Sequence, residues 1–270
     1  MTALGHTEPA TGNSIMRNSI MRNPTMQNSA LRDSTLREAA PADPAALDPS
    51  ALARRTMVDC QIRTFDVTDA ALLARMLETP RERFLPAALK PLAYSDASLR
   101  LHPGAPGAAP RSLTPPLILA RLLQGARVMA SDKALIVAAG CGYATALVAG
   151  LAHEVVALEA DPALFAELRA NLDGFGLGGV RALRGPLAAG APDDAPFDLI
   201  VIDGAVAAHL APLLGQLKDG GRLVTILRLA DGTTKAVRYD KAAGAAGYRI
   251  LFDAPAPVLE AFAPAAEFAF

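Results

Sequence analysis

The feature that most constrains the fold is a regular alternation of apolar and helical segments that begins near Lys133. Apolar runs of strand length alternate with segments of helical periodicity; the runs are ALIVAA, EVVALE, VRALR, FDLIVID and RLVTIL. Strands that are apolar on both faces are typical of a parallel sheet covered by helices on both sides. Two later runs, TKAVRYD and YRILFDA, are expected to pair as antiparallel edge strands. The pattern predicts an α/β fold with a doubly wound, mostly parallel sheet over residues 131–270.

Residues 51–130 are expected to form a helical segment that packs on this sheet. ALARRTMVDCQIRTF and VTDAALLARMLE both have helical spacing, and the second ends at Pro80. The expected buried positions of the first helix are Leu52, Met57, Cys60 and Ile62. A glycine- and proline-rich surface loop, LHPGAPGAAPR, leads to a further helix, SLTPPLILARLLQ. The sequence thus predicts an N-terminal helical extension of the α/β domain.

Residues 1–50 have a different character. A five-residue repeat runs from residue 14 to residue 38 as SIMRN, SIMRN, PTMQN, SALRD and STLRE, and the linker-like PADPAALDPS follows it. A spacing of five rotates the apolar positions around a helix, so they never form one apolar face. Such a segment cannot offset the entropy of ordering it. We expect a disordered low-complexity arm and linker, with a partner-binding arm as the alternative.

Charge and cysteine content exclude several kinds of site. The 26 Lys and Arg residues balance 27 Asp and Glu residues, so no basic field indicates a nucleic acid partner. Cys60 and Cys141 lie far apart and match neither a zinc nor a disulfide pattern. The four histidines are scattered without metal-ligand spacing, so no metal site is expected. Unpaired cysteines favour a reducing compartment.

One segment has the length of a membrane span. Residues 134–152 carry no charge and are just long enough to cross a bilayer. Glycines at 140 and 142 interrupt the segment, and a buried strand, a tight turn and a buried helix account for it better. No basic-then-apolar signal peptide is present at the N-terminus. We therefore expect a cytoplasmic protein that does not contact a membrane.

The first strand–turn–helix unit is the expected ligand site. In doubly wound sheets, ligands bind beyond the carboxyl ends of the strands, beside a glycine turn and a helix N-terminus. Gly140 and Gly142 follow the first strand, where the missing Cβ allows the backbone to approach a ligand. Glu159 ends the next strand, nineteen residues after Gly140, where a carboxylate accepts both hydroxyls of a ribose. We expect Glu159 to face the crevice rather than the core. This geometry fits either NAD or S-adenosylmethionine.

Two further features favour the methyl donor. Asp203 closes the strand FDLIVID, and the following strand opens with LKDGGRLV; both motifs resemble class I methyltransferases. Helices also precede the first strand, whereas many dinucleotide-binding folds start directly on it. Asp203 is interpreted as a cofactor contact, with capping of the next helix as the alternative.

From about Ala51 to Phe270 the chain resembles the protein-L-isoaspartate O-methyltransferase family. The motifs that carry the resemblance are MVDCQIR, VTDAALLARMLETPRERFLP, AYSD, SLTPPLILARLL, VAAGCGYATALVAGL and APFDLIVIDGA with LKDGGRLV. The order PRERFLP, AYSD and then a Ser/Thr-Pro helix is the specific part, because other methyltransferases lack it. The resemblance implies a Rossmann-like class I domain that uses S-adenosylmethionine. It also implies methylation of the α-carboxyl of isoaspartyl residues in damaged proteins, a repair activity.

The resemblance also implies a set of site residues. Thr114 falls at the active-site position, where its hydroxyl would donate a hydrogen bond to the substrate carboxylate; capping of the helix that begins at Pro115 is the alternative. The implied cofactor-binding residues are Ala138, Gly140, Gly142, Tyr143, Glu159 and Asp203. A carboxylate is already ionised at neutral pH and a sulfonium is already an activated electrophile. Proximity and orientation therefore suffice for catalysis, and no acid–base pair is required.

Three positions depart from the family pattern. Ile136 replaces an acidic residue of the first strand, Ala138 replaces the first glycine of the loop, and Pro115 replaces a glutamine. Overpacking by a methyl group costs ~1–3 kcal/mol, so we expect cofactor affinity to fall roughly ten- to a hundredfold. Two other functions stay open beside the methyltransferase: a non-enzymatic paralogue that binds protein, and a NAD-type oxidoreductase.

Overall fold

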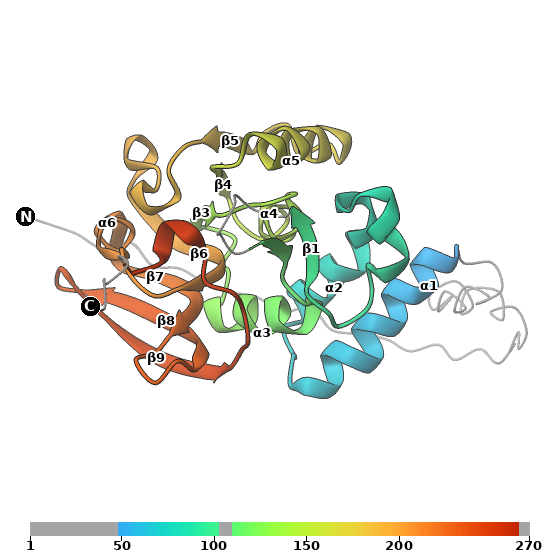
Figure 1. Cartoon of the computed structure of the whole chain (residues 1–270), viewed down its shortest axis with the longest axis horizontal. Helices are drawn as coiled ribbons and strands as arrows, with labels where there is room; N and C mark the ends of the chain where they lie inside the picture. Colours follow the sequence, from blue (N-terminus) through green and yellow to red (C-terminus); the bar gives the residue numbers. More distant parts are fainter. Residues whose placement is uncertain (1–47, 103–109, 265–270) are drawn as a thin grey trace, which may run out of the picture. The chain divides into compact units, whose positions relative to one another are not determined.

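A computed structural model describes residues 48–102 and 110–264 and contains a mixed sheet (Figure 1). The sheet has seven strands in the order β5-β4-β3-β6-β7-β8-β9. Their bounds are β3 (Lys133–Val137), β4 (Glu154–Glu159), β5 (Arg181–Arg184), β6 (Phe197–Val206), β7 (Leu217–Arg228), β8 (Thr234–Ala242) and β9 (Ala245–Asp253). Strands β3 to β7 pair in parallel, while β8 and β9 pair antiparallel at one edge. The α/β fold and both edge strands are confirmed.

The strand order determines where the expected crevice lies. From β3 the chain moves outward to β4 and β5, and it then returns to β6 on the other side of β3. The carboxyl ends of β3, β4 and β6 therefore meet at the point where the strand order reverses, which is where ligands bind in such sheets. The turn after β3, Glu159 at the end of β4, and Asp203 in β6 all lie at this edge.

Helices cover the sheet. Their bounds are α1 (Pro49–Thr56), α2 (Ala70–Glu78), α3 (Pro116–Ala126), α4 (Tyr143–Ala149), α5 (Pro162–Gly174) and α6 (Ala211–Gly215). Short turns of 3-10 helix lie at Arg63–Phe65, Arg81–Phe84, Ala87–Leu92, Leu187–Ala189, Pro192–Asp194 and Glu260–Phe262. Strands β1 (Leu99–His102) and β2 (Arg111–Leu113) form a separate antiparallel pair. None of the helices within the described ranges is long and apolar enough to cross a membrane.

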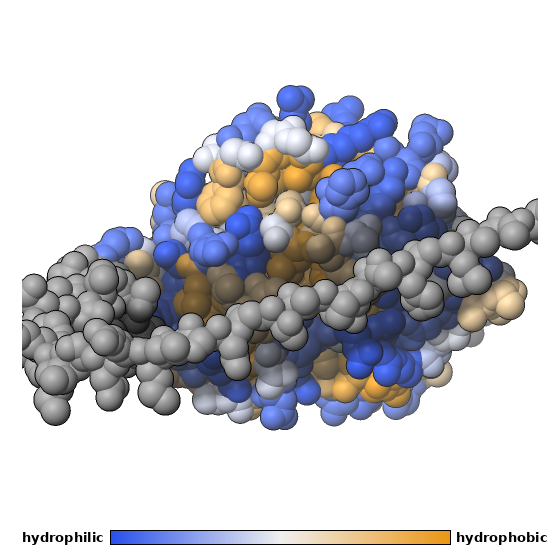
Figure 2. Space-filling model, turned by 180° about the vertical axis from the view of Figure 1, so that it is seen from behind, coloured by the Kyte–Doolittle hydropathy of each residue, from blue (hydrophilic) through white to orange (hydrophobic). Residues whose placement is uncertain are grey.

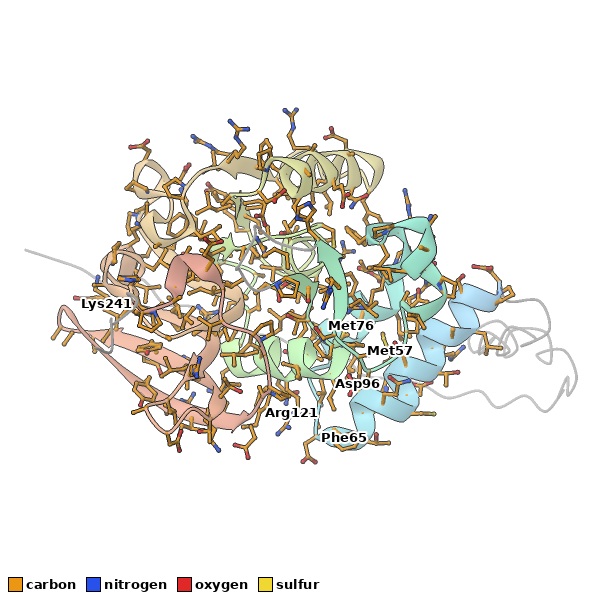
Figure 3. All side chains as sticks on the ribbon, in the orientation of Figure 1. Met57, Phe65, Met76, Asp96, Arg121 and Lys241 are labelled. Carbon is orange, nitrogen blue, oxygen red and sulfur yellow. The ribbon has the colours of Figure 1, made fainter. Side chains whose placement is uncertain are left out.

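Both faces of β3 are buried, as its uninterrupted apolar sequence predicts. Ala134 and Ile136 join one hydrophobic cluster, whereas Leu135 and Val137 join another. The first cluster also contains buried side chains from the segment before the sheet, including Met57 and Met76 (Figure 3). The helices of residues 51–130 thus pack on one face of the sheet. The division into an arm, a helical segment and a methyltransferase domain stays a prediction, and the arm lies outside the described residues up to position 47.

The predicted burial of the first helix is partly wrong. Met57 and Ile62 are fully buried, but Leu52 is 43% exposed and Cys60 is also exposed. Leu52 lies in α1, none of whose residues is buried. Cys60 lies in the π-helix Met57–Ile62 that continues α1, whose wider turn changes which residues share a face. Ordinary helical spacing does not hold there.

Figure 2, seen from behind, shows how hydrophilic and hydrophobic residues both reach the surface of one face of the molecule.

A buried ion pair fixes the opposite, amino-terminal edge of the sheet. Arg222 of β7 is 3% exposed and binds both carboxylate oxygens of Asp132, at 3.0 and 2.5 Å. The remaining N–H groups of this guanidinium donate to the backbone carbonyls of Ala126, Arg127 and Asp198. One side chain therefore joins the end of α3 to the beginnings of β3 and β6.

Candidate active site

The turn after β3 has the backbone geometry of a ligand-binding loop. Ala138, Gly140 and Gly142 have φ values of 61°, 55° and 97°, all in the left-handed region. A Cβ added at Gly142 would lie 2.9 Å from Cδ1 of Leu168, and any residue there must adopt this positive φ, so a larger residue would be strained there. The tight glycine turn predicted from the sequence is confirmed, and it brings backbone N–H groups to the carboxyl end of the sheet.

Ala138 is the strained position of this turn. A left-handed conformation costs an L-residue roughly 1–2 kcal/mol, and Ala138 is only 2% exposed. The turn has thus kept its left-handed conformation in spite of the added Cβ.

Replacing Ala138 by glycine should therefore stabilise the protein. The relief of strain of about 1–2 kcal/mol is offset by about 0.4–1 kcal/mol of greater unfolded-state entropy. We expect a net gain of about 0.5–1 kcal/mol, measured by denaturant unfolding. Ala139→Gly, at a neighbouring position without a positive φ, is the matched control and should destabilise. Equal losses in both variants would contradict strain at Ala138.

Glu159 forms a buried ion pair through its carboxylate, which accepts hydrogen bonds at all of its acceptor positions, and we call this arrangement a saturated pair. Its side chain is 0% exposed, and Arg111 donates to its two oxygens at 2.8 and 2.9 Å. The backbone N–H groups of Gly140, Ala160 and Asp161 donate to the same carboxylate at 2.8, 2.8 and 3.0 Å. Arg111 therefore covers the Glu159 carboxylate on its solvent side, and the part of Glu159 in cofactor binding stays a prediction.

Sequence reasoning missed Arg111. This residue ends the glycine- and proline-rich segment that was interpreted as a surface loop, and nothing in the sequence distinguishes it from a solvated arginine. In the structure it begins β2, and its side chain is 16% exposed. Its guanidinium also donates to the carbonyl of Ala138 at 3.2 Å, so it contacts both the turn and the carboxylate.

Thr114 and Asp203 form the second part of the site. The Thr114 hydroxyl donates to Oδ1 of Asp203 at 2.5 Å, and each residue is 8% exposed. Neither residue caps a helix: α3 and α6 have Pro115 and Leu210 at their N-caps, without side-chain hydrogen bonds. The capping alternatives for both residues are therefore wrong. Burial raises the pKa of the Asp203 carboxyl above its ordinary value, although the Thr114 hydrogen bond and nearby arginines oppose this effect.

Arg81 lies beneath this pair. It comes from the PRERFLP motif, is 0% exposed, and donates to the Thr114 carbonyl at 2.7 Å. Its guanidinium carbon lies 4.6 Å from the centroid of the Tyr143 ring, which is itself fully buried. Tyr143 therefore packs against Arg81, and its part in cofactor binding stays a prediction. Burial raises the pKa of the neighbouring Cys141 thiol to about 12, so this thiol stays protonated at neutral pH and does not act as a nucleophile.

A cavity of about 870 Å³ opens beside Thr114 and Asp203. Its walls come from α3, the ends of β6 and β7, and the segment 255–259. Figure 3 labels two of its charged lining residues, Arg121 of α3 and Asp96. The volume is within the range of about 300–1,000 Å³ that is usual for ligand pockets. Thr114 and Asp203 line this cavity, whereas the turn 138–142 and Glu159 are absent from its described lining. The Thr114–Asp203 pair therefore lies on the side of the site that faces the cavity.

Comparison with known proteins gives one consistent family. Residues 53–251 match the family model described as Protein-L-isoaspartate(D-aspartate) O-methyltransferase. The chain is 36% identical over 173 residues to a protein-L-isoaspartate O-methyltransferase of Koribacter versatilis (strain Ellin345), which covers 64% of this chain and 75% of the relative. It is 38% identical over 173 residues to one of Methylorubrum extorquens (strain PA1), which covers 64% and 72%.

Solved structures agree on the fold. A protein-L-isoaspartate O-methyltransferase structure superimposes with a TM-score of 0.66 at 20% identity, over 76% of this chain and 65% of that one. A beta-aspartate methyltransferase from Plasmodium falciparum, in complex with S-adenosyl-L-homocysteine, gives a TM-score of 0.65 at 17% identity, over 77% and 98%. The Rossmann-like methyltransferase fold expected from the resemblance is therefore confirmed.

Proposed function

This chain belongs to the protein-L-isoaspartate(D-aspartate) O-methyltransferase family, and we propose that its methyl donor and acceptor meet between the turn after β3 and the Thr114–Asp203 pair. The protein is an S-adenosylmethionine-dependent methyltransferase that acts on the carboxyl of L-isoaspartyl residues. The observation that carries the proposed placement is the Thr114–Asp203 pair, which lines an 870 Å³ cavity at the carboxyl edge of the sheet.

The proposed donor side consists of the turn and Glu159. Three alternate left-handed positions, Ala138, Gly140 and Gly142, shape the turn that leads into the N-terminus of α4, where backbone N–H groups can face a ligand. Glu159 would accept the ribose hydroxyls, and Tyr143 would support the turn from below. These residues fit S-adenosylmethionine provided that Arg111 leaves the carboxylate. The bound donor supplies a methyl group that is already activated on its sulfonium.

The proposed acceptor side consists of Thr114 and Asp203. The isoaspartyl carboxylate is its own nucleophile, so this side of the site only has to bind and orient it. The Thr114 hydroxyl already donates to Asp203. A neutral Asp203 would donate its own O–H to the substrate carboxylate, whereas an ionised Asp203 would repel it. The raised pKa of Asp203 favours the neutral form.

Substrate affinity should therefore fall as pH rises. An acid with a raised pKa is neutral below that pKa and charged above it, so repulsion begins as Asp203 ionises. Charged groups that act on it are Arg81, Arg111 and Glu159. We expect the KM for an isoaspartyl peptide to rise by about tenfold, equivalent to ~1.4 kcal/mol, as the pH rises through the raised pKa of Asp203.

The measurement is KM against pH for the wild type, Asp203→Asn and Asp198→Asn. Asp203→Asn keeps the shape and a donor without a charge, so its KM should change little with pH. Asp198 lies at the far end of the same strand, beside Lys218, and its replacement should leave the wild-type profile in place. A pH profile that persists in Asp203→Asn would remove this role from Asp203.

Calorimetric titration with S-adenosylhomocysteine and with NAD tests the choice of cofactor. We expect binding of S-adenosylhomocysteine alone. Tighter binding of NAD would favour an oxidoreductase, and binding of neither would favour a paralogue that binds protein without catalysis. We propose isoaspartyl-containing proteins as partners, with nucleic acid and membranes excluded from that role. We also propose a cytoplasmic location, which the two free cysteines support.

A further inference from the structure

We propose that Arg111 sets the affinity of this site for S-adenosylmethionine by competing with the ribose for Glu159. This inference rests on the proposed function. It concerns a residue of this chain that neither the motifs nor the family comparison identifies. Arg111 forms a bidentate pair with the carboxylate that the nucleoside would use, at 2.8 and 2.9 Å.

The hydrogen-bonding capacity of Glu159 carries the first step. A carboxylate offers about four acceptor positions, and this one receives five N–H donors. Three of them are backbone N–H groups, of Gly140, Ala160 and Asp161, which the turns after β3 and β4 hold in place. The other two belong to Arg111. A ribose diol therefore has no acceptor on Glu159 until Arg111 withdraws.

The position of Arg111 carries the second step. Glu159 is 0% exposed, while the Arg111 side chain is 16% exposed, so the arginine lies on the solvent side of the pair. Rotation of its side chain away from β2 would uncover the carboxylate without any change in the sheet. The same rotation would break its 3.2 Å contact with the Ala138 carbonyl and so free the turn.

The energetic consequence follows from the equilibrium between the two arrangements. A ligand that binds only the minor, open arrangement has its apparent affinity reduced by the fraction of molecules that are open. A bidentate arginine–carboxylate pair is among the stronger hydrogen-bonded pairs in proteins, so this fraction is small. Weakening the pair should raise the affinity for the nucleoside.

The experiment titrates S-adenosylhomocysteine into the full-length wild type, Arg111→Ala and Arg111→Gln by calorimetry. We expect Arg111→Ala to bind about tenfold tighter or better, with Arg111→Gln intermediate because its amide still donates one hydrogen bond. Arg184→Ala is the matched control. Arg184 pairs with Glu159 in the strand register, is exposed, and leaves the carboxylate untouched, so its removal should not change affinity.

Melting curves keep the test independent of folding. Arg111→Ala retains the three backbone donors to Glu159, and titrations are made below its melting transition. S-adenosylhomocysteine should raise its melting temperature by more than that of the wild type, because the ribose restores partners to the carboxylate. In the double variant Arg111→Ala/Glu159→Ala, the gain in affinity should disappear.

Each outcome separates the two proposals. If only Arg111→Ala binds S-adenosylhomocysteine, or if it binds much more tightly than the wild type, the result supports competition by Arg111. Equal or weaker binding by Arg111→Ala, beside a wild type that binds, overturns the competition and leaves the methyltransferase function in place. Absence of binding by every folded variant contradicts the proposed donor site and the role of Arg111 together.

Discussion

Replacing Glu159 by alanine should lower the free energy of unfolding by about 3–5 kcal/mol and should abolish S-adenosylhomocysteine binding. The alanine leaves the Arg111 guanidinium and the N–H groups of Gly140, Ala160 and Asp161 without their acceptor. From sequence alone the same substitution would leave the fold intact, since the carboxylate was expected to face the crevice. Full burial of Glu159 reverses that expectation.

Denaturant unfolding of Glu159→Ala, Arg111→Ala and the double variant measures the effect. Because removal of one partner of a buried pair is worse than removal of both, the double variant should lose less stability than the sum of the two single variants. A loss below about 1 kcal/mol in Glu159→Ala, the size usual for an exposed ion pair, would contradict the saturated pair.

Replacing Arg222 by methionine should also lower the free energy of unfolding by about 3–5 kcal/mol. It leaves the nearly unexposed Asp132 carboxylate with the Met129 N–H but without its cationic partner, and it removes one donor from each of three backbone carbonyls. Because this pair lies at the amino-terminal edge of the sheet, the folded variant should bind S-adenosylhomocysteine like the wild type. Glu159→Ala, by contrast, should lose both stability and binding.

Lys218→Ala is the control for Arg222→Met. Lys218 forms a partly exposed ion pair with Asp198 in the same strand region, and such pairs contribute about 0–1 kcal/mol. The free energies of unfolding of the two variants should therefore differ by several kcal/mol. If they coincide, Arg222 does not fix this edge of the sheet.

The apolar pattern predicted the sheet because its central strands are buried on both faces and are therefore largely apolar along their length. β3 and β6 are uninterrupted apolar runs, and β8 and β9 carry the mixed pattern of an edge. The helices were less predictable. The segment AAHLAPLLGQL has helical spacing, yet only Ala211–Gly215 of it forms a helix, α6, because β6 extends to Val206 and His209 adopts a left-handed φ of 63°.

The sequence identified most residues of the site but did not predict which of them form hydrogen bonds with one another. Thr114 and Asp203 were both identified, yet their hydrogen bond joins residues 89 positions apart and depends on where β6 lies beside the Ser/Thr-Pro segment. The contact between Arg111 and Glu159 likewise spans 48 positions. Neither pairing has a local signal, so the sequence placed a free carboxylate where the folded chain has a saturated one.

The central claim is methyl transfer, and a labelled-methyl assay tests it most directly. The full-length protein is incubated with S-adenosylmethionine carrying a labelled methyl group and with two peptides that differ only in an isoaspartyl or an ordinary aspartyl residue. The account predicts label on the isoaspartyl peptide alone, as a base-labile methyl ester. Equal labelling of both peptides, or no label on the isoaspartyl peptide from a protein that binds S-adenosylhomocysteine, would contradict it.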